Sequence, residues 1–172
     1  FGGHAMSNSL DTVLNASKLS KEQDIIYVLV GNGVDKEKLK QRAISENIKN
    51  VFFLDQINKH AIPELVKRFD CSLMTGKPSP LYKYGLCMNK MYDSMMAGKP
   101  IICAISAPRT LVEEFDCGIQ VNSATPDDIA NAVSAIHDMK DKDRESMGEH
   151  GRAAVIENFT YSKLASNFIA VI

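Results

Sequence analysis

The chain has 172 residues, of which 45% are hydrophobic and 24% are charged, and its formal net charge is -1 at pH 7. This length suits one domain with a sizeable core, and the composition is ordinary for a soluble globular protein. The balanced charge, with no long block of one sign, disfavours a nucleic-acid or anionic-membrane surface. No run of about eighteen apolar residues occurs, so no membrane-spanning helix is expected. The four cysteines form no Cys-x-x-Cys pair, which disfavours a zinc site and predicts buried free thiols in a reducing compartment.

Strand-like and helix-like segments alternate along the chain. Phe1–His4 resembles the end of a strand whose start precedes it. We then expect strands at 25–30, 51–54, 71–75, 101–105 and 118–121, with a turn at 31–33 after the first of them. We expect helices at 9–19, 35–47, 64–69, 89–97 and 110–115, which alternate with these strands. Three more helices follow, one that starts at 125, one at 142–158 and one at 162–172.

Several helix ends carry recognisable signals. Asn8 or Ser9 can cap the first helix, because their side chains accept a hydrogen bond from a free backbone N–H. Gly98 is suited to the C-terminal end of the helix at 89–97. Thr125 followed by Pro126 is typical of a helix start.

The alternation of strands and helices predicts βαβ units. The fold class is therefore α/β, with a single Rossmann-like, doubly wound parallel sheet, helices on both of its faces, and helices at the C-terminal end. Ligands of such sheets bind at the carboxyl ends of the strands. This rule points to the loops at 3–8, 55–58, 75–89 and 104–109.

The segment 89–102 runs from a polar loop into a short helix, a glycine and a buried strand. Asn89 and Lys90 stand at the helix start, where free N–H groups and the positive end of the dipole favour an anion. Lys90 opposes that dipole, and a bound diphosphate would supply the reason for its presence. Asp93 follows one turn later on the same side, where a carboxylate can accept two ribose hydroxyls. The alternative is a solvated Lys90–Asp93 pair on an ordinary helix.

This segment reads NKMYDSMMAGKPII. It resembles the C-terminal domain of the family 4 retaining glycosyltransferases, which have the GT-B fold and often read PNKLF(D/E)YMAAGKPVI here. The likeness continues in the same order at 1–11, 28–40, 50–54 and 147–161. It covers essentially the whole chain, and its specificity lies in the ordered set of segments.

The resemblance implies that residues 1–172 form the nucleotide-sugar-binding C-terminal domain of a glycosyltransferase, without its N-terminal acceptor domain. The donor would be a nucleoside-diphosphate sugar, with UDP favoured, and transfer would retain configuration. The acceptor would be a glycan or lipid-linked sugar of surface polysaccharide or lipopolysaccharide synthesis. No cofactor, metal or nucleic-acid partner is expected. The full-length enzyme would be cytoplasmic, with peripheral association at the inner face of the cell membrane, and the domain alone would be inactive.

Two acidic positions of the family map onto this sequence in different ways. The second acidic residue of its Glu-x₇-Glu pattern corresponds to Asp93, on the donor ribose. Gly85 stands where the first glutamate would contact the donor sugar, with Lys83 and Tyr84 beside it. Lys90 is the expected catalytic residue, because it would stabilise the departing diphosphate.

The other candidate donor-binding residues lie in the first two loops. His4 and Asn8 occupy the loop in which many family members carry an arginine and a lysine that clamp the diphosphate. Ile57 and Asn58 follow a strand end, where their backbone can read a base edge or simply form a turn. The glycines of Gly31-Asn32-Gly33 favour a turn over a phosphate loop.

Two other functions remain open from the sequence. A nucleotide-sugar 2-epimerase-like enzyme would need acidic and histidine residues that converge on the sugar, and Glu113 and Glu114 are the only acidic pair close to a predicted strand end. A non-catalytic nucleotide-binding or interaction module would have a decayed donor site. The missing first glutamate and missing arginine–lysine clamp support this last reading.

Overall fold

The computed structural model describes residues 1–20, 24–121 and 124–171. Its strands are β1 (Tyr27–Val30), β2 (Val51–Leu54), β3 (Ser72–Thr75), β4 (Ile101–Ala104) and β5 (Gly118–Gln120). Its α-helices are α1 (Leu10–Leu19), α2 (Lys36–Ser45), α3 (Ile62–Val66), α4 (Asn89–Met96), α5 (Leu111–Glu114), α6 (Pro126–Asp138), α7 (Asp141–Asn158) and α8 (Tyr161–Ile169). Short 3-10 turns lie at Met6–Asn8, Lys59–Ala61 and Pro80–Tyr84. The predicted alternation is confirmed, with element ends displaced by a few residues; Ile172, expected in the last helix, lies outside the described residues.

The strands pair in parallel, as the fold class requires, but in two separate ladders. β1 pairs with β2, and β4 lies between β3 and β5. The expected single sheet is therefore hydrogen-bonded as two parts. Phe1–His4, expected to end a strand, forms no strand here, although the N–H of Gly2 donates to the carbonyl of Val30 at 2.9 Å.

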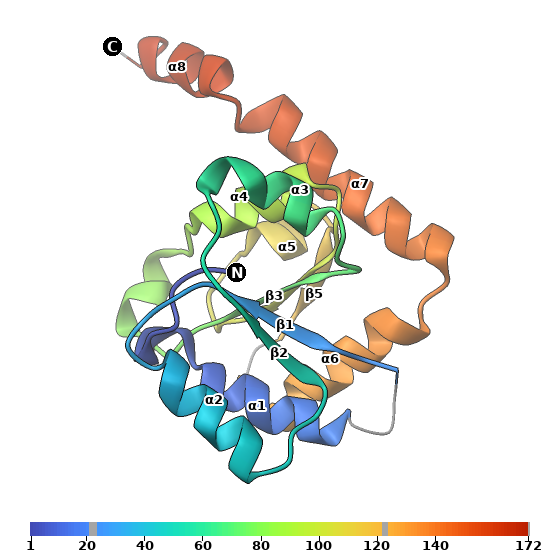
Figure 1. Cartoon of the computed structure of the whole chain (residues 1–172). Helices are drawn as coiled ribbons and strands as arrows, with labels where there is room; N and C mark the ends of the chain where they lie inside the picture. The colour runs from blue at the N-terminus through green and yellow to red at the C-terminus, as the bar shows by residue number, and fades with distance from the viewer. Residues whose placement is uncertain (21–23, 122–123, 172) are drawn as a thin grey trace.

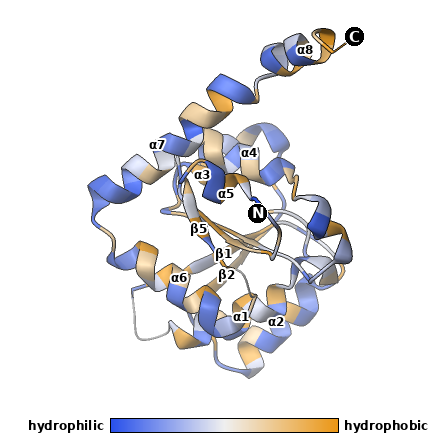
Figure 2. Ribbon diagram, turned by 180° about the vertical axis from the view of Figure 1, so that it is seen from behind, coloured by the Kyte–Doolittle hydropathy of each residue, from blue (hydrophilic) through white to orange (hydrophobic). Residues whose placement is uncertain are grey.

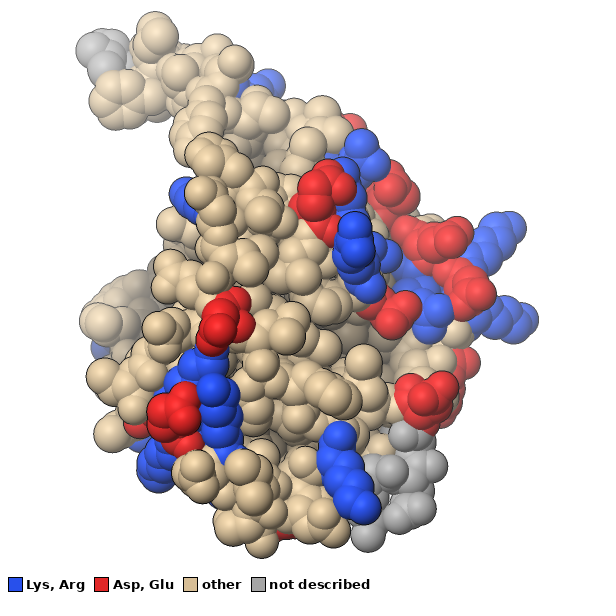
Figure 3. All heavy atoms as spheres, viewed as in Figure 1, with Lys and Arg blue, Asp and Glu red and all other residues tan. Residues whose placement is uncertain are grey.

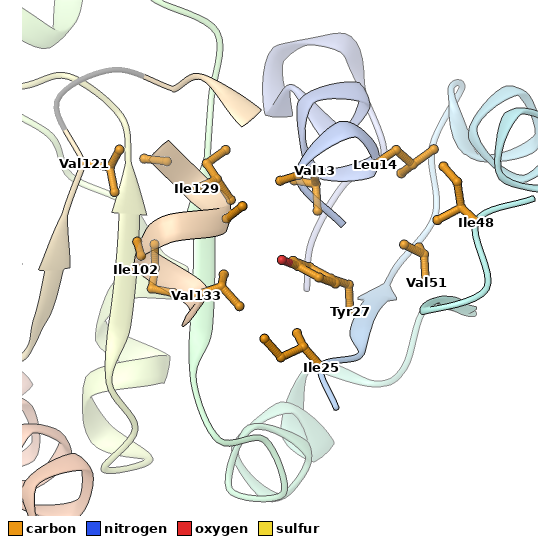
Figure 4. Close-up of a cluster of buried hydrophobic side chains, with 14 of the residues drawn as sticks. Val13, Leu14, Ile25, Tyr27, Ile48, Val51, Ile102, Val121, Ile129 and Val133 are labelled. Atoms are coloured by element: carbon orange, nitrogen blue, oxygen red, sulfur yellow. The ribbon is translucent and has the colours of Figure 1, made fainter. Parts of the chain in front are cut away.

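Helices cover both faces of the strands, so the doubly wound architecture is confirmed. In Figure 1, α1, α2 and α6 lie on one side of the strands, and α3, α4 and α5 lie on the other. The core has two corresponding parts. One packs α1 and α6 against β1 and β4, as Figure 4 shows for Val13, Tyr27, Ile102 and Val133. The other packs α4 and α7 around residues such as Met95.

Hydropathy follows this layering. Figure 2 shows hydrophobic residues gathered in the strands, while the helices mix both kinds. The charged residues visible in Figure 3 intermix both signs on that face. The cysteines are all free, as expected. Cys103 and Cys117 are also buried as predicted, but Cys71 is only partly buried and the prediction of a buried thiol is wrong for Cys87, which is exposed.

The helix ends agree with the sequence signals except at α1. Thr125 accepts a hydrogen bond from the N–H of Asp128 at the start of α6, and Gly98 follows α4 with a φ of 68°. Neither Asn8 nor Ser9 caps α1. Ser9 takes a left-handed conformation, with a φ of 50°, and makes no side-chain cap bond. The Asn8 amide is used in the preceding loop instead.

The C-terminal helices differ in how they pack. α7 crosses α4 so closely that a Cβ atom on Gly148 would lie 2.1 Å from the carbonyl oxygen of Gly98. α8 projects away from the body of the molecule, with no buried residue (Figure 1). Its apolar side chains Phe168 and Ile169 are exposed. No helix within the described ranges is long and apolar enough to cross a membrane.

The close approach at Gly148 predicts that a glycine-to-alanine substitution there lowers the free energy of unfolding, although such a substitution in a helix normally raises it. Glycine to alanine inside a helix normally stabilises by about 1 kcal/mol. We expect Gly148→Ala to destabilise the protein by about 1–3 kcal/mol, because the added methyl group must push α7 away from Gly98. Urea denaturation measures the effect. Ala153→Gly, at an exposed position of the same helix, is the control for helix propensity alone. A stabilised Gly148→Ala variant would contradict the close α4–α7 contact.

Candidate functional site

The loop after Phe1–His4 is fastened to the carboxyl end of β3. The Asn8 side-chain amide donates to the carbonyl of Gly3 at 2.6 Å, which closes the loop on itself. The Thr75 hydroxyl donates to the carbonyl of Asn8, also at 2.6 Å. The N–H of Lys77 donates to the carbonyl of Ser7 at 2.9 Å. These bonds fix the predicted donor-binding loop at 3–8 beside the loop that leads towards α4.

The Gly31-Asn32-Gly33 turn packs directly under this loop. A Cβ atom on Gly31 would lie 1.8 Å from the carbonyl oxygen of Gly2, and one on Gly33 would lie 2.3 Å from that of His4. Both glycines also have positive φ, at 146° and 157°. The interpretation of this segment as a turn is therefore supported, because the glycines permit a backbone approach that no side chain would allow.

Lys36 connects the loop after β1 to the loop after β2, and the sequence analysis did not identify this role. Its side chain is buried, and its ammonium donates to the carbonyls of Gly31 at 2.8 Å and Leu54 at 2.9 Å. The same ammonium donates to the carboxylate of Asp55 at 2.7 Å. This hydrogen bond lowers the pKa of the Asp55 carboxyl. A buried cation thus holds the carboxyl ends of β1 and β2 in fixed positions.

A cavity of about 660 Å³ brings three of the predicted residues together. His4, Asn8 and Lys90 line it near the carboxyl ends of β1 and β3, beside Thr75. His4 is 3% exposed, and its Nδ1 atom has no hydrogen-bond partner among the described residues. Burial and, after it, the Lys36 charge lower the pKa of the His4 imidazole. The charged form of the His4 imidazole is therefore disfavoured, and its Nδ1 atom can still form a hydrogen bond.

Lys90 lies in the first turn of α4, as predicted, and is only partly exposed. Burial lowers the pKa of its ammonium, and no carboxylate of the described residues forms an ion pair with it. Asp93 is half-buried and does not line the cavity. The solvated Lys90–Asp93 pair, the alternative left open by the sequence, does not form in the described chain. An unneutralised lysine at a helix start is suited to an anionic ligand.

A second cavity, of about 370 Å³, lies at the next loop. Gly2, Asn32 and Ile57 line it, so Ile57 is brought beside the loop that carries His4. Asn58 does not line this cavity. Its side chain accepts a hydrogen bond from the N–H of His60 at 3.0 Å and caps a 3-10 turn. Of the 55–58 loop, Gln56 and Ile57 border the cavity.

The remaining predicted residues are not gathered at either cavity. Lys83, Tyr84 and Gly85 are exposed in and after a 3-10 turn, where the Lys83 ammonium lies 4.8 Å from the Tyr84 ring centroid. Gly85 has a φ of 117° and open space around it. Asn89 is exposed as the first residue of α4.

Glu113, half of the acidic pair considered for an epimerase, has a structural role. Its carboxylate accepts from the hydroxyl of Thr110 at 3.2 Å, while the Thr110 hydroxyl accepts from the Glu113 N–H. This capping box starts α5 and engages the carboxylate. Within the described residues, no three His, Cys, Asp or Glu side chains are grouped so that they could hold a metal ion.

The buried His4 predicts a specific pH dependence of stability. Its pKa is lower in the folded state, so the unfolded chain binds more protons as the pH falls below about 6.5. Stability should therefore fall from pH 7.5 to pH 5.5 more steeply in the unmodified chain than in His4→Gln. Urea denaturation at both pH values measures the two slopes. Equal slopes would show that the His4 imidazole is not held neutral by burial.

Comparisons with known proteins agree with this architecture. The uncharacterized glycosyltransferase MJ1069 of Methanocaldococcus jannaschii is 22% identical over 165 residues, which cover 95% of this chain and 40% of that protein. The putative colanic acid biosynthesis glycosyl transferase WcaI of Escherichia coli is 28% identical over 76 residues, covering 44% of this chain and 19% of that one. The structure of Anabaena Alr3699/HepE, determined in complex with UDP, matches with a TM-score of 0.78 at 16% identity.

The Anabaena match covers 100% of this chain and 48% of that protein, so the chain spans less than half the length of these relatives. At this identity the likeness establishes the fold, which is that of a GT-B glycosyltransferase domain. The family model described as "Glycosyl transferases group 1" matches residues 7–154, from the loop that carries Asn8 to the last third of α7. The chain therefore belongs to the group 1 glycosyl transferases.

Proposed function

We propose that this chain is the donor-binding half of a retaining glycosyltransferase and that it holds a UDP-sugar between the start of α4 and the loop at 3–8. The observation that carries the proposal is Lys90. It is half-buried at a helix start, lacks a carboxylate partner among the described residues, and lines the same cavity as His4 and Asn8.

The chemistry of that position favours a diphosphate. The first N–H groups of α4 have no partner within the helix, and the helix dipole adds partial positive charge there. Lys90 adds a full charge, which is costly without an anion because the ammonium is partly removed from water. A diphosphate would neutralise the site, and the same interactions would stabilise UDP as it departs from the sugar.

His4 supplies a neutral hydrogen bond beside this charge. Its Nδ1 atom is buried and unpartnered among the described residues. A buried polar atom without a partner is unfavourable by about 1–3 kcal/mol, so a ligand that bonds to it gains affinity. We assign this nitrogen to a phosphate oxygen or a sugar hydroxyl of the donor.

In this proposal the ribose would lie beside Asp93, and the base would lie beside the loop that carries Ile57. Asp93 lies one turn further along α4 and is half-buried, where its carboxylate can accept ribose hydroxyls. Ile57 borders the 370 Å³ cavity, and the backbone of its loop can bond the edge of a uracil ring. The exposed Lys83, Tyr84 and Gly85 would then face the donor sugar or the acceptor.

The complete reaction requires parts beyond this chain. The acceptor, a glycan or lipid-linked sugar, would be held by a further domain, consistent with the short span of this chain against its relatives. The similarity to WcaI, a putative colanic acid biosynthesis glycosyl transferase, supports a place in surface polysaccharide synthesis. Such a full-length enzyme would act in the cytoplasm, at the inner face of the membrane, and residues 1–172 alone should not transfer sugar, because transfer needs both substrates held together.

The direct test of the proposal is UDP binding by this chain. One side of an interdomain cleft makes part of the contacts, so we expect a Kd near the millimolar range, about 4 kcal/mol of binding free energy. Isothermal titration calorimetry with UDP, GDP and their sugars measures the affinity and the preference for a base. The absence of heat with every nucleotide at millimolar concentration would overturn the proposal and favour a non-catalytic module.

Two substitutions separate the diphosphate contact from the ribose contact. Lys90→Ala should weaken both UDP and pyrophosphate at least tenfold, because one charge-assisted hydrogen bond contributes about 1.5–3 kcal/mol. Asp93→Asn should weaken UDP but not pyrophosphate, which has no ribose. Calorimetry with both ligands measures the four affinities.

Lys142→Ala, which removes an exposed lysine of α7, is the matched control and should leave both affinities unchanged. If Lys90→Ala leaves UDP affinity unchanged but lowers the melting temperature without ligand, Lys90 has a structural role and the site assignment is wrong.

A further inference from the structure

The 370 Å³ cavity lies between two loops that follow neighbouring strands. Asn32, in the turn after β1, lines one side of it. Gln56 and Ile57, in the loop after β2, line another side. Because these loops leave different strands, the width of the cavity depends on how far apart the chain holds them.

Backbone hydrogen bonds fix this separation only as far as the strands reach. The last bond between the two segments runs from the N–H of Gly31 to the carbonyl of Leu54, at 3.2 Å. Within the described part of the chain, no backbone hydrogen bond joins residues 32–34 to residues 55–58. The two loops that border the cavity therefore depend on side chains for any further connection.

Lys36 makes such a connection. Its ammonium has three N–H groups and meets three acceptors, the carbonyls of Gly31 and Leu54 and the carboxylate of Asp55, at distances of 2.8, 2.9 and 2.7 Å. Gly31 borders the cavity, and Asp55 stands directly before a residue that borders it. Lys36 itself lines neither cavity, so its influence on a ligand passes through the two loops.

Packing alone does not explain why a lysine is buried here. The Lys36 side chain is 5% exposed, and the removal of an ammonium from water is unfavourable. The Asp55 side chain remains 96% exposed, so water screens the ion pair and weakens it. An apolar side chain could fill the same space, and replacing a buried ion pair in this way is often neutral or stabilising. The arrangement is suited to the accurate placement of two loops rather than to added stability.

We infer that Lys36 is a positioning residue of the donor site, which sets the width of the 370 Å³ cavity and hence the fit of the nucleoside part of the donor without touching the donor. The inference rests on the proposed function, in which the base lies beside the loop that carries Ile57. A displaced loop would lose hydrogen bonds to the edge of the base. The main charge contact of the diphosphate is assigned to Lys90, which lines the other cavity and has no bond to Lys36.

The affinities for UDP and for pyrophosphate, measured by NMR titration, test the inference. Lys36→Met keeps an unbranched side chain but removes its three donors. We expect it to weaken UDP about fivefold or more, because the displaced loop loses about one hydrogen bond to the base. Pyrophosphate has no base, so its affinity should stay within about twofold. Lys38→Met removes an exposed lysine of the same helix and is the matched control, which should change neither affinity.

Lys36→Arg separates the position of the loops from the charge. The substitution keeps the positive charge, but the longer, planar guanidinium cannot direct its donors at the same three acceptors. We expect UDP to bind about threefold more weakly, with pyrophosphate unchanged. An equal loss of affinity for both ligands would show that Lys36 acts through its charge or through overall stability, and the inference would be wrong.

Asp55→Ala decides the question if Lys36→Met does not fold. The exposed Asp55 side chain can be removed without opening the core. Its loss removes one of the three contacts, so UDP should bind about twofold to threefold more weakly, again with pyrophosphate unchanged. An unfolded Lys36→Met variant together with an unchanged UDP affinity in Asp55→Ala would mean that Lys36 serves folding alone, which contradicts the inference.

Two negative results have different meanings. If the unmodified chain binds UDP and the folded Lys36→Met variant binds it equally well, the positioning role is wrong and the proposed function stands. If the unmodified chain binds no nucleotide, the proposed function is wrong, and the inference that rests on it is wrong as well.

Discussion

Parallel strand pairing is the constraint on which the rest of this structure depends. Since the strands run in one direction, their carboxyl ends meet at one edge, and each chain reversal at that edge places a loop beside its neighbours. The loop at 3–8, the glycine turn after β1, the start of α2 and the start of α4 all meet there. Because these loops lie close together, the single buried ammonium of Lys36 donates to the carbonyls of both Gly31 and Leu54. The candidate site inherits its geometry from these backbone contacts.

The electrostatic character of the site follows from the same convergence. Lys36, Lys90 and the start of α4 bring positive charge to one edge of the strands, and Asp55 neutralises Lys36. Lys90 is left without a counter-ion among the described residues, and burial, together with the nearby Lys36 charge, lowers the pKa of the His4 imidazole. An anionic ligand that also accepts a neutral hydrogen bond fits this pattern better than a cation or an apolar ligand.

The sequence predicted the parts of this protein that local patterns determine. The alternation of strands and helices, the start of α4 at Asn89, and the glycine turn at 31–33 all follow from periodicity and residue type. The positions of Lys36 and Asn8 do not. In the sequence, Lys36 is one of several charged residues of a helix and is not distinguished from the others. Its role depends on two carbonyl groups that only tertiary packing brings together. Asn8 has the side chain of a cap, but the loop bond to Gly3 engages it instead. Gly85 stands where the family carries a glutamate, with Lys83 and Tyr84 beside it, and this loop lies outside both cavities. The alternation of strands and helices also did not predict that the strands pair as two separate ladders.

The central claim is that the start of α4 and the loop at 3–8 hold a diphosphate. A crystal structure of this chain with UDP tests it most directly, because it places the phosphates without reference to activity. The account predicts the diphosphate at the N-terminal end of α4, within hydrogen-bond distance of the Lys90 ammonium and of His4 or the backbone of its loop. UDP bound at another surface, with Lys90 and His4 untouched by the phosphates, would contradict it.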